Sequence, residues 1–127
     1  MNTLEKVRRE IMKTILYIDN SESYRLLLQE ELSQEGFQVV TASSIEEALS
    51  KWREINPRLV ILELRQNRLS LDVFEKLKNK YPKVLWIGYS TYFQCPEEFK
   101  KWVNFYLPKS SRIEEIKTLI QGLPVAR

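Results

Sequence analysis

The chain has 127 residues, of which 43% are hydrophobic and 29% charged, with 3 Gly and 5 Pro. This composition is typical of one globular domain and excludes a disordered or low-complexity chain. A net charge of +3, from 20 basic and 17 acidic residues, gives little support to nucleic-acid binding. The chain has no histidine and one cysteine, Cys95. These counts exclude a Ser-His-Asp triad, a His-ligated zinc site and an internal disulfide.

The sequence contains no apolar run near the roughly 20 residues of a membrane span and no signal-peptide core at its N-terminus. We therefore expect a cytoplasmic protein without membrane contact. We also expect that it is not an enzyme, because histidine-based acid–base and nucleophilic catalysis are excluded.

The pattern of apolar runs and helix signals predicts five strands alternating with five helices within residues 14–122. Residues 1–13 precede this domain as a leader with helical spacing of its apolar residues, and residues 123–127 follow it as a short tail. The strands are predicted at 15–18, 37–42, 59–64, 84–87 and 103–107. The helices are predicted at 22–35, 45–55, 71–81 and 96–102, with a last helix opened by Ser111 and ending near Gln121.

The run Leu59–Leu64 is the clearest strand, because four apolar residues follow one another before Glu63. Such a run indicates a strand that is buried on both faces, which is typical of parallel sheets covered by helices. Strands alternating with helices predict an α/β fold with a doubly wound, five-stranded parallel sheet of flavodoxin-like order 2-1-3-4-5.

Polar residues follow three of the predicted strands. Asp19 and Asn20 follow the first strand, Glu63 ends the third and Lys109 follows the fifth. In this topology the carboxyl ends of strands one and three border one crevice. Carboxylate and carboxamide oxygens there can bind Mg²⁺, and a lysine can neutralise a carboxylate. Asp and Asn after a strand are also common turn formers and helix caps.

The stretches 15–20, 59–63 and 105–110, Ile-Leu-Tyr-Ile-Asp-Asn, Leu-Val-Ile-Leu-Glu and Phe-Tyr-Leu-Pro-Lys-Ser, resemble the receiver domain of bacterial response regulators, the CheY-like fold. The resemblance implies a signalling module of a two-component phosphorelay. In that family an Asp that ends strand three accepts a phosphoryl group, and an acidic pair after strand one binds Mg²⁺. A Thr or Ser ending strand four, an aromatic residue on strand five and a following Lys respond to phosphorylation.

Carried over to this sequence, Asp19 matches the first acidic residue, Tyr106 the aromatic residue and Lys109 the lysine. Asn20 replaces the second acidic residue, and Glu63 stands at the phosphoacceptor position. Gly88 is interpreted as occupying the Thr or Ser position, although Ser90 and Thr91 are close.

These departures predict a pseudo-receiver in which Glu63 pairs with Lys109 and holds one fixed state. The expected cofactor is none, with weak Mg²⁺ binding at Asp19, Asn20 and Glu63 as the variant. The alternatives are a phosphoaccepting receiver with a weakened Mg²⁺ site and, more remotely, a flavodoxin-like cofactor-binding protein.

The expected partner is a protein, either another signalling protein or a second copy of this chain. Eight of the 14 aromatic residues fall between residues 86 and 106, and exposed aromatics with basic neighbours favour a protein interface. The resemblance implies that the face of helix four, strand five and helix five serves output and dimerisation. The candidate surface residues are Tyr92, Phe93, Lys100, Lys101, Trp102 and Phe105; alternatively, the cluster fills the space of a shortened helix.

Overall fold

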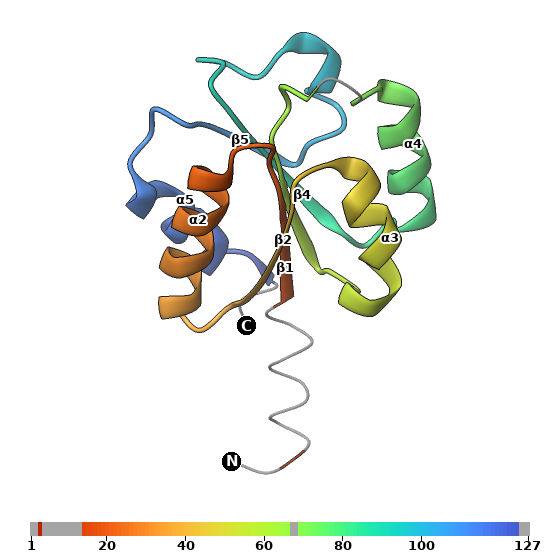
Figure 1. The fold of residues 1–127 in the computed structure, drawn as a ribbon. Helices are drawn as coiled ribbons and strands as arrows, with labels where there is room; N and C mark the ends of the chain where they lie inside the picture. Colours follow the sequence, from red (N-terminus) through yellow and green to blue (C-terminus); the bar gives the residue numbers. More distant parts are fainter. Residues whose placement is uncertain (1–2, 4–13, 67–68, 125–127) are drawn as a thin grey trace.

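The computed structural model describes residues 3, 14–66 and 69–124, which include one parallel five-stranded sheet (Figure 1). The strand order is β2-β1-β3-β4-β5, as predicted. All four neighbouring pairs are parallel. The strands are β1 (Thr14–Ile18), β2 (Gln38–Ala42), β3 (Leu59–Leu62), β4 (Leu85–Ser90) and β5 (Phe105–Pro108). Apart from residue 3, the leader helix predicted within residues 1–13 lies outside the described residues.

Helices cover both faces of the sheet, in agreement with the prediction. The α2 helix (Glu22–Gln34) and the α5 helix (Ile113–Gln121) lie on one face; α3 (Ile45–Ile55) and α4 (Leu71–Lys80) lie on the other (Figure 1). Successive β1 residues point to opposite faces. Ile15 and Tyr17 therefore join the core under α2 and α5, while Leu16 and Ile18 join the core under α3 and α4. Every residue of β1 and β3 is buried, as expected for central strands.

The helix ends follow local sequence signals. Ser21, Ser44 and Ser70 are the N-caps of α2, α3 and α4, and each hydroxyl accepts the backbone N–H three residues later. These caps satisfy N–H groups that have no partner within the helix. Gly36, with φ 89°, follows the C-terminus of α2, and Asn56, with φ 46°, ends α3. Both adopt the left-handed conformation that stops a helix.

The C-terminal helix departs from its predicted cap and tail. The Ser111 hydroxyl donates a 2.6 Å hydrogen bond to the Pro108 carbonyl instead of capping a helix. The α5 helix begins at Ile113. Arg112 occupies the N-cap position, but its side chain makes no capping hydrogen bond. Leu123, which we placed in the tail, is buried in the core under α2 and α5. The domain therefore extends past the predicted boundary at residue 122.

The region after strand four differs most from the prediction. The β4 strand continues to Ser90, three residues beyond the predicted end. The helix predicted at 96–102 is only a 3₁₀ turn, η1 (Glu97–Phe99). Its hydrogen bonds join residues three apart, from Phe99 N to Pro96 O (3.0 Å) and from Trp102 N to Phe99 O (2.9 Å). Such bonds tighten a short segment into a 3₁₀ turn.

Three leucines on the helices, Leu26 and Leu27 on α2 and Leu49 on α3, are exposed. Within the described parts of the chain, no helix has both the length and the apolar character needed to cross a membrane.

Candidate functional site

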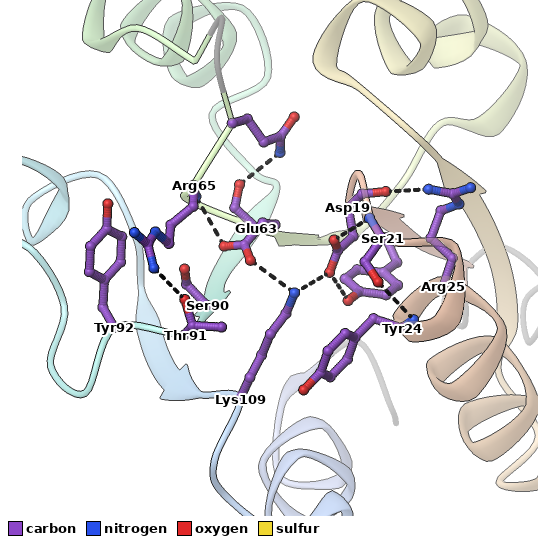
Figure 2. A network of polar contacts seen from close by, with 12 residues as sticks. Asp19, Ser21, Tyr24, Arg25, Glu63, Arg65, Ser90, Thr91, Tyr92 and Lys109 are labelled. Carbon is purple, nitrogen blue, oxygen red and sulfur yellow. Dashed lines mark hydrogen bonds and ion pairs between the residues drawn. The ribbon is translucent and has the colours of Figure 1, made fainter.

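Residues from three strand ends meet at the carboxyl edge of the sheet. Lys109 Nζ lies 2.7 Å from Asp19 Oδ2 and 2.9 Å from Glu63 Oε1, so one ammonium bridges two carboxylates (Figure 2). The side chains are 5%, 0% and 5% exposed, respectively. The structure therefore brings together the acidic and basic residues that the sequence placed at this edge.

Backbone hydrogen bonds fix all three positions. Asp19 N donates to Ala42 O at 3.0 Å, and Glu63 N donates to Ile18 O at 2.9 Å. Lys109 N donates to the carbonyl of the last β4 residue at 2.6 Å. Each bond continues the ladder between neighbouring strands, so the rigid sheet sets the distances between the three side chains.

Both carboxylate oxygens of Asp19 accept hydrogen bonds. Oδ1 accepts the Ser21 backbone N–H at 2.8 Å, and Oδ2 accepts the Tyr17 hydroxyl in addition to the Lys109 ion pair. The Arg25 guanidinium donates to the Asp19 backbone carbonyl at 2.7 Å (Figure 2). Buried carboxylates require such partners, because an unpaired buried charge costs several kcal/mol.

Glu63 is held in the same manner by the chain that follows it. The Arg65 backbone N–H donates to Glu63 Oε2 at 3.0 Å, and Gln66 Nε2 donates to the Glu63 carbonyl oxygen at 2.7 Å. The Arg65 N–H and the Lys109 ammonium thus give each Glu63 carboxylate oxygen one donor.

Three tyrosines that the predicted site did not include lie near the lysine or its partner Asp19. Lys109 Nζ lies 4.0 Å from the ring centroid of Tyr24 and 5.9 Å from that of Tyr89. The Tyr89 ring makes edge contacts with Tyr17 and Tyr24, at 6.3 and 6.2 Å between centroids. Residues two apart on a strand share a face, so the spacing of Tyr17 and Asp19 already contained a signal for their contact.

Burial and the neighbouring charges shift several pKa values in the site. Burial alone would lower the pKa of Lys109, but the hydrogen bonds and charges of Asp19 and Glu63 outweigh it and raise that pKa. Burial, followed by the hydrogen bond to Asp19, raises the pKa of Tyr17. Burial, with smaller contributions from nearby tyrosine and carboxylate charges, raises the pKa of Tyr89 to about 12. The site therefore favours a charged lysine and neutral tyrosines.

The oxygens that a divalent cation would need at this site are bonded to protein donors in this structure. Asn20 is exposed, and the two buried carboxylates give all four of their oxygens to protein donors. Among the described residues there is no group of three or more Asp, Glu, His or Cys side chains that could hold a metal. A cation would have to displace the Lys109 ammonium from both carboxylates, and Mg²⁺ requires several oxygen ligands in near-octahedral geometry.

The structure corrects the interpretation of Gly88. This residue lies inside β4, opposite Leu62, and Ser90 ends the strand. A Cβ built on Gly88 would lie 3.0 Å from Tyr106 Cδ1 and 3.2 Å from Leu64 Cδ1, so the glycine makes room for these side chains. Strand four therefore ends on a residue with a hydroxyl, Ser90. Its Oγ is buried and has no hydrogen-bond partner among the described residues.

Tyr106 contacts the loop that follows β4. Its hydroxyl donates to the backbone carbonyl of Tyr92 and, at 3.4 Å, to that of Ser90. Burial, followed by the charges of Cys95 and Glu63, raises the Tyr106 pKa to about 12. The aromatic residue of strand five is thus half-buried and packed against the backbone of the neighbouring loop.

Of the six residues predicted for the partner surface, five are exposed and Trp102 is partly buried. Phe93 is 82% exposed, and Tyr92 and Phe105 are each 37% exposed. Trp102 instead packs inward: its ring stacks on Phe74 with 6.3 Å between centroids, and its indole N–H is buried. Of the two predicted basic neighbours, Lys100 pairs with Glu97 at 2.7 Å, and the Lys101 ammonium lies 5.0 Å from the Trp102 ring centroid.

Solved structures of response regulators share this fold over most of the chain. The Thermotoga maritima response regulator TrrA, in complex with Mg²⁺ and BeF, is 31% identical, with a TM-score of 0.74 over 84% of this chain and 95% of that one. The same protein in complex with the histidine kinase ThkA gives 30% identity and a TM-score of 0.72, covering 84% of this chain and 94% of that one. Vibrio cholerae CheY4, at 24% identity and a TM-score of 0.74, covering 86% and 97%, supports the fold alone.

Curated relatives match a shorter stretch. The alkaline phosphatase synthesis transcriptional regulatory protein PhoP of Bacillus subtilis is 38% identical over 69 residues, which is 54% of this chain and 29% of PhoP. The probable transcriptional regulator ycf27 of Cyanophora paradoxa is 40% identical over 57 residues, or 45% of this chain and 24% of that protein. The chain thus matches less than a third of these curated relatives.

The fold and the similar structures define the class: this is a CheY-like response-regulator receiver domain, a signalling module of two-component systems. Within that class the chain belongs to the VpsR domain family, whose family model matches residues 4–98.

Proposed function

We propose that this domain is a pseudo-receiver that signals through protein contacts without phosphorylation. The observation that carries the proposal is the bridging position of Lys109, whose buried ammonium pairs with both Asp19 and Glu63. One positive charge between two carboxylates compensates half of their charge, so it weakens the attraction of the site for a further cation. The arrangement supports a domain held in one state, with no divalent cofactor.

The Glu63 side chain disfavours phosphoryl transfer for a second reason. Glutamate is one methylene longer than aspartate, so its carboxylate lies further along the crevice than the family phosphoacceptor. In-line transfer depends on placement, and displacements near 1 Å can cost on the order of 100-fold in rate. A carboxylate also carries about one negative charge where a phosphoryl group carries nearly two. Glu63 is therefore at most a partial mimic of the phosphorylated state.

A phosphoaccepting receiver with a weakened Mg²⁺ site is the second candidate, and Ser90 is the observation that favours it. In the family a Thr or Ser at the end of strand four responds to the phosphoryl group, and Ser90 provides that hydroxyl here. Of the three departures that the sequence indicated, two remain: Asn20 and Glu63.

Treatment of the intact domain with acetyl phosphate and Mg²⁺, followed by intact mass measurement, separates the two candidates. A pseudo-receiver keeps its mass. A stoichiometric gain of one phosphoryl group, mapped to Glu63 or Asp19 by peptide analysis, would overturn the proposal and favour the phosphoaccepting receiver.

The proposed partner is a protein that contacts the aromatic surface formed by Tyr92, Phe93 and Phe105. Exposed aromatic side chains are enriched at protein interfaces, and TrrA in complex with ThkA provides an example of a receiver bound to another protein. A second copy of this chain is the other candidate for this surface. Catalysis by the domain itself forms no part of the proposal, and a cytoplasmic location remains a prediction.

The surface is tested by affinity capture with the wild-type domain and with the Phe93→Ser variant, alongside a sizing measurement of each. We expect one specific partner, or the dimer, to be lost in the variant. Leu26→Ser on α2 is the matched control, because Leu26 is also an exposed apolar side chain. Capture or dimerisation that survives Phe93→Ser and is lost in Leu26→Ser would assign binding to α2 instead.

A further inference from the structure

The loop that carries Phe93 is held at three points. The Tyr106 hydroxyl donates to the Tyr92 carbonyl. The Arg65 guanidinium donates to Thr91 Oγ1 at 2.9 Å and lies 4.8 Å from the centre of the Tyr92 ring. Thr91 and Tyr92, the two residues before Phe93, are therefore held by these contacts, while the Phe93 side chain extends into solvent.

Arg65 also contacts the buried ion-pair site. Its backbone N–H donates to Glu63 Oε2 at 3.0 Å, the oxygen that Lys109 does not contact. Its side chain crosses from the end of β3 to the loop after β4 (Figure 2). One residue thus contacts the buried ion pair through its backbone and the exposed aromatic loop through its side chain.

Three other routes run from the site toward this loop, and they are less direct. Lys109 contacts Glu63 through its ammonium, but its backbone N–H donates to the carbonyl of Ser90, the last β4 residue, and not to the loop itself. The Ser90 hydroxyl has no partner among the described residues, so it transmits nothing by hydrogen bonding here. Tyr106 binds the loop through backbone carbonyls of the loop and of Ser90. Within the described part of the chain, its hydroxyl bonds to these carbonyls and not to Glu63. The described contacts leave Arg65 as the residue that bonds to Glu63 and to the loop.

We propose that Arg65 is a positioning residue that couples the bonding state of Glu63 to the placement of the Tyr92–Phe93 loop. Two mechanical features support this role. A hydrogen bond to an ionised acceptor is stronger than a neutral one, so the Glu63 charge fixes the Arg65 backbone. The planar guanidinium can donate a hydrogen bond and stack on an aromatic ring at once. A change at Glu63 therefore reaches the loop through one side chain.

This inference rests on the proposed partner surface, and it names how the buried site would set that surface. It does not require the domain to be free of phosphorylation, since any change in the Glu63 carboxylate would act on the same bond. The acetyl phosphate experiment and the test below can therefore fail independently.

Fluorine NMR tests the coupling directly. The intact chain is labelled with 4-fluorophenylalanine at its five phenylalanines, and Phe93→Leu assigns the Phe93 resonance. We expect Glu63→Gln to shift this resonance in the wild-type background and to shift it by less than about half as much in the Arg65→Gln background. We also expect Arg65→Gln to shift it on its own and Arg65→Lys to restore it in part, because a lysine retains the charge over the Tyr92 ring.

Arg53→Gln is the matched control. Arg53 is exposed on α3 and undergoes the same change of chemistry, so it should leave both the resonance and its response to Glu63→Gln unchanged. Thr91→Val provides a second approach if Glu63→Gln does not fold, because it removes the Arg65 acceptor and leaves Glu63 intact. It should shift the Phe93 resonance in the wild-type background and not in the Arg65→Gln background.

Two results would overturn the coupling. One is a Phe93 resonance whose chemical shift is unchanged by Glu63→Gln in the wild-type background. The other is a response of equal size with and without Arg65, which would assign the effect to Tyr106 or to the backbone of β4.

Discussion

Lys109 Nζ lies 2.9 Å from Glu63 Oε1, and both side chains are only 5% exposed. A buried pair of this kind adds little net stability, because desolvation of both charges offsets much of their attraction. Removal of one partner is different, since it leaves a buried charge without compensation. Here one ammonium serves two carboxylates, so the lysine is the member whose loss has the largest consequence.

Substitution Lys109→Met should therefore destabilise the domain strongly. Asp19 and Glu63 would remain as two buried carboxylates without a cation, and breaking a buried pair costs about 3–5 kcal/mol. Urea unfolding followed by tryptophan fluorescence measures the change. The matched control is Lys51→Met, which breaks a pair with Glu47 whose side chains are 46% and 37% exposed and which should cost no more than about 0.5 kcal/mol. Equal losses in the two variants would contradict the special role of the buried pair.

The sequence predicted the sheet order and the residues at its edge because these depend on regular patterns. Unbroken apolar runs predict central strands, and polar residues directly after them fall at one edge once the strands are parallel. The meeting of Asp19, Glu63 and Lys109 follows from those two facts. The end of β4 could not be found in this manner. Gly88 interrupts the apolar run and looks like a strand terminator, whereas in the structure it accommodates the Tyr106 ring.

Long-range side-chain contacts were beyond the sequence for a physical reason. The contact of the Lys109 ammonium with the Tyr24 ring depends on the first turn of α2, and that of Arg65 with Tyr92 depends on two loops. The two residues of each pair are far apart in the sequence, and no regular helix or strand spacing predicts their contact. The segment predicted as a helix at 96–102 contains only a 3₁₀ turn. Phe99 and Trp102 pack around Phe74 there, and tertiary packing of this kind can outweigh local helix preference.

Alkaline pH should unfold the domain through its tyrosines and lysine. The pKa of Tyr89 is raised to about 12 and that of Tyr17 is also raised, against about 10 in an unfolded chain. The unfolded state therefore loses protons first, and the free energy of unfolding falls as the pH rises from about 10. Lys109 acts in the same direction, because its raised pKa gives stability that is present below the unfolded pKa and lost as pH rises through the folded value.

Absorbance at 295 nm during a pH titration checks this expectation. Of the six tyrosines, those with raised pKa values should ionise late, in step with the loss of circular dichroism. The same titration in urea should show one transition near pH 10 for all of them. A single transition near pH 10 in the folded domain would contradict the burial and bonding of Tyr17 and Tyr89.

Two small substitutions in β4 should have opposite effects on stability. Gly88→Ala places a methyl group 3.0 Å from Tyr106 Cδ1, and such overpacking costs about 1–3 kcal/mol. Ser90→Ala removes a buried hydroxyl that has no partner among the described residues, so it should be neutral or stabilising by about 1 kcal/mol. Urea unfolding of both variants distinguishes them. A clear loss of stability in Ser90→Ala would mean that its hydroxyl makes a bond that this structure does not contain.

Magnesium should have little effect on the wild-type domain and a larger one on Lys109→Met. In the wild type the lysine occupies the space between the two carboxylates, so 10-fold increases in Mg²⁺ should leave the melting temperature unchanged. In the variant the carboxylates lack a cation, and a ligand that binds only the folded state raises its stability by mass action. Differential scanning fluorimetry with Mg²⁺, and with Ca²⁺ as a size control, measures both. A rise of the wild-type melting temperature with Mg²⁺ alone would contradict the poor fit of this site to a divalent cation.

Restoration of two residues should convert the domain into a phosphoacceptor. The double substitution Asn20→Asp and Glu63→Asp supplies the acidic pair and the shorter carboxylate of the family, while Ser90 and Lys109 are already in place. The shorter side chain should also lengthen the contact with Lys109 and free an oxygen for Mg²⁺. We expect the variant to gain one phosphoryl group from acetyl phosphate and Mg²⁺, observed by intact mass. The gain should be abolished by Glu63→Asn in the same Asn20→Asp background. Failure of the restored variant to react while it remains folded would contradict the assignment of the lost phosphoryl transfer to these two positions.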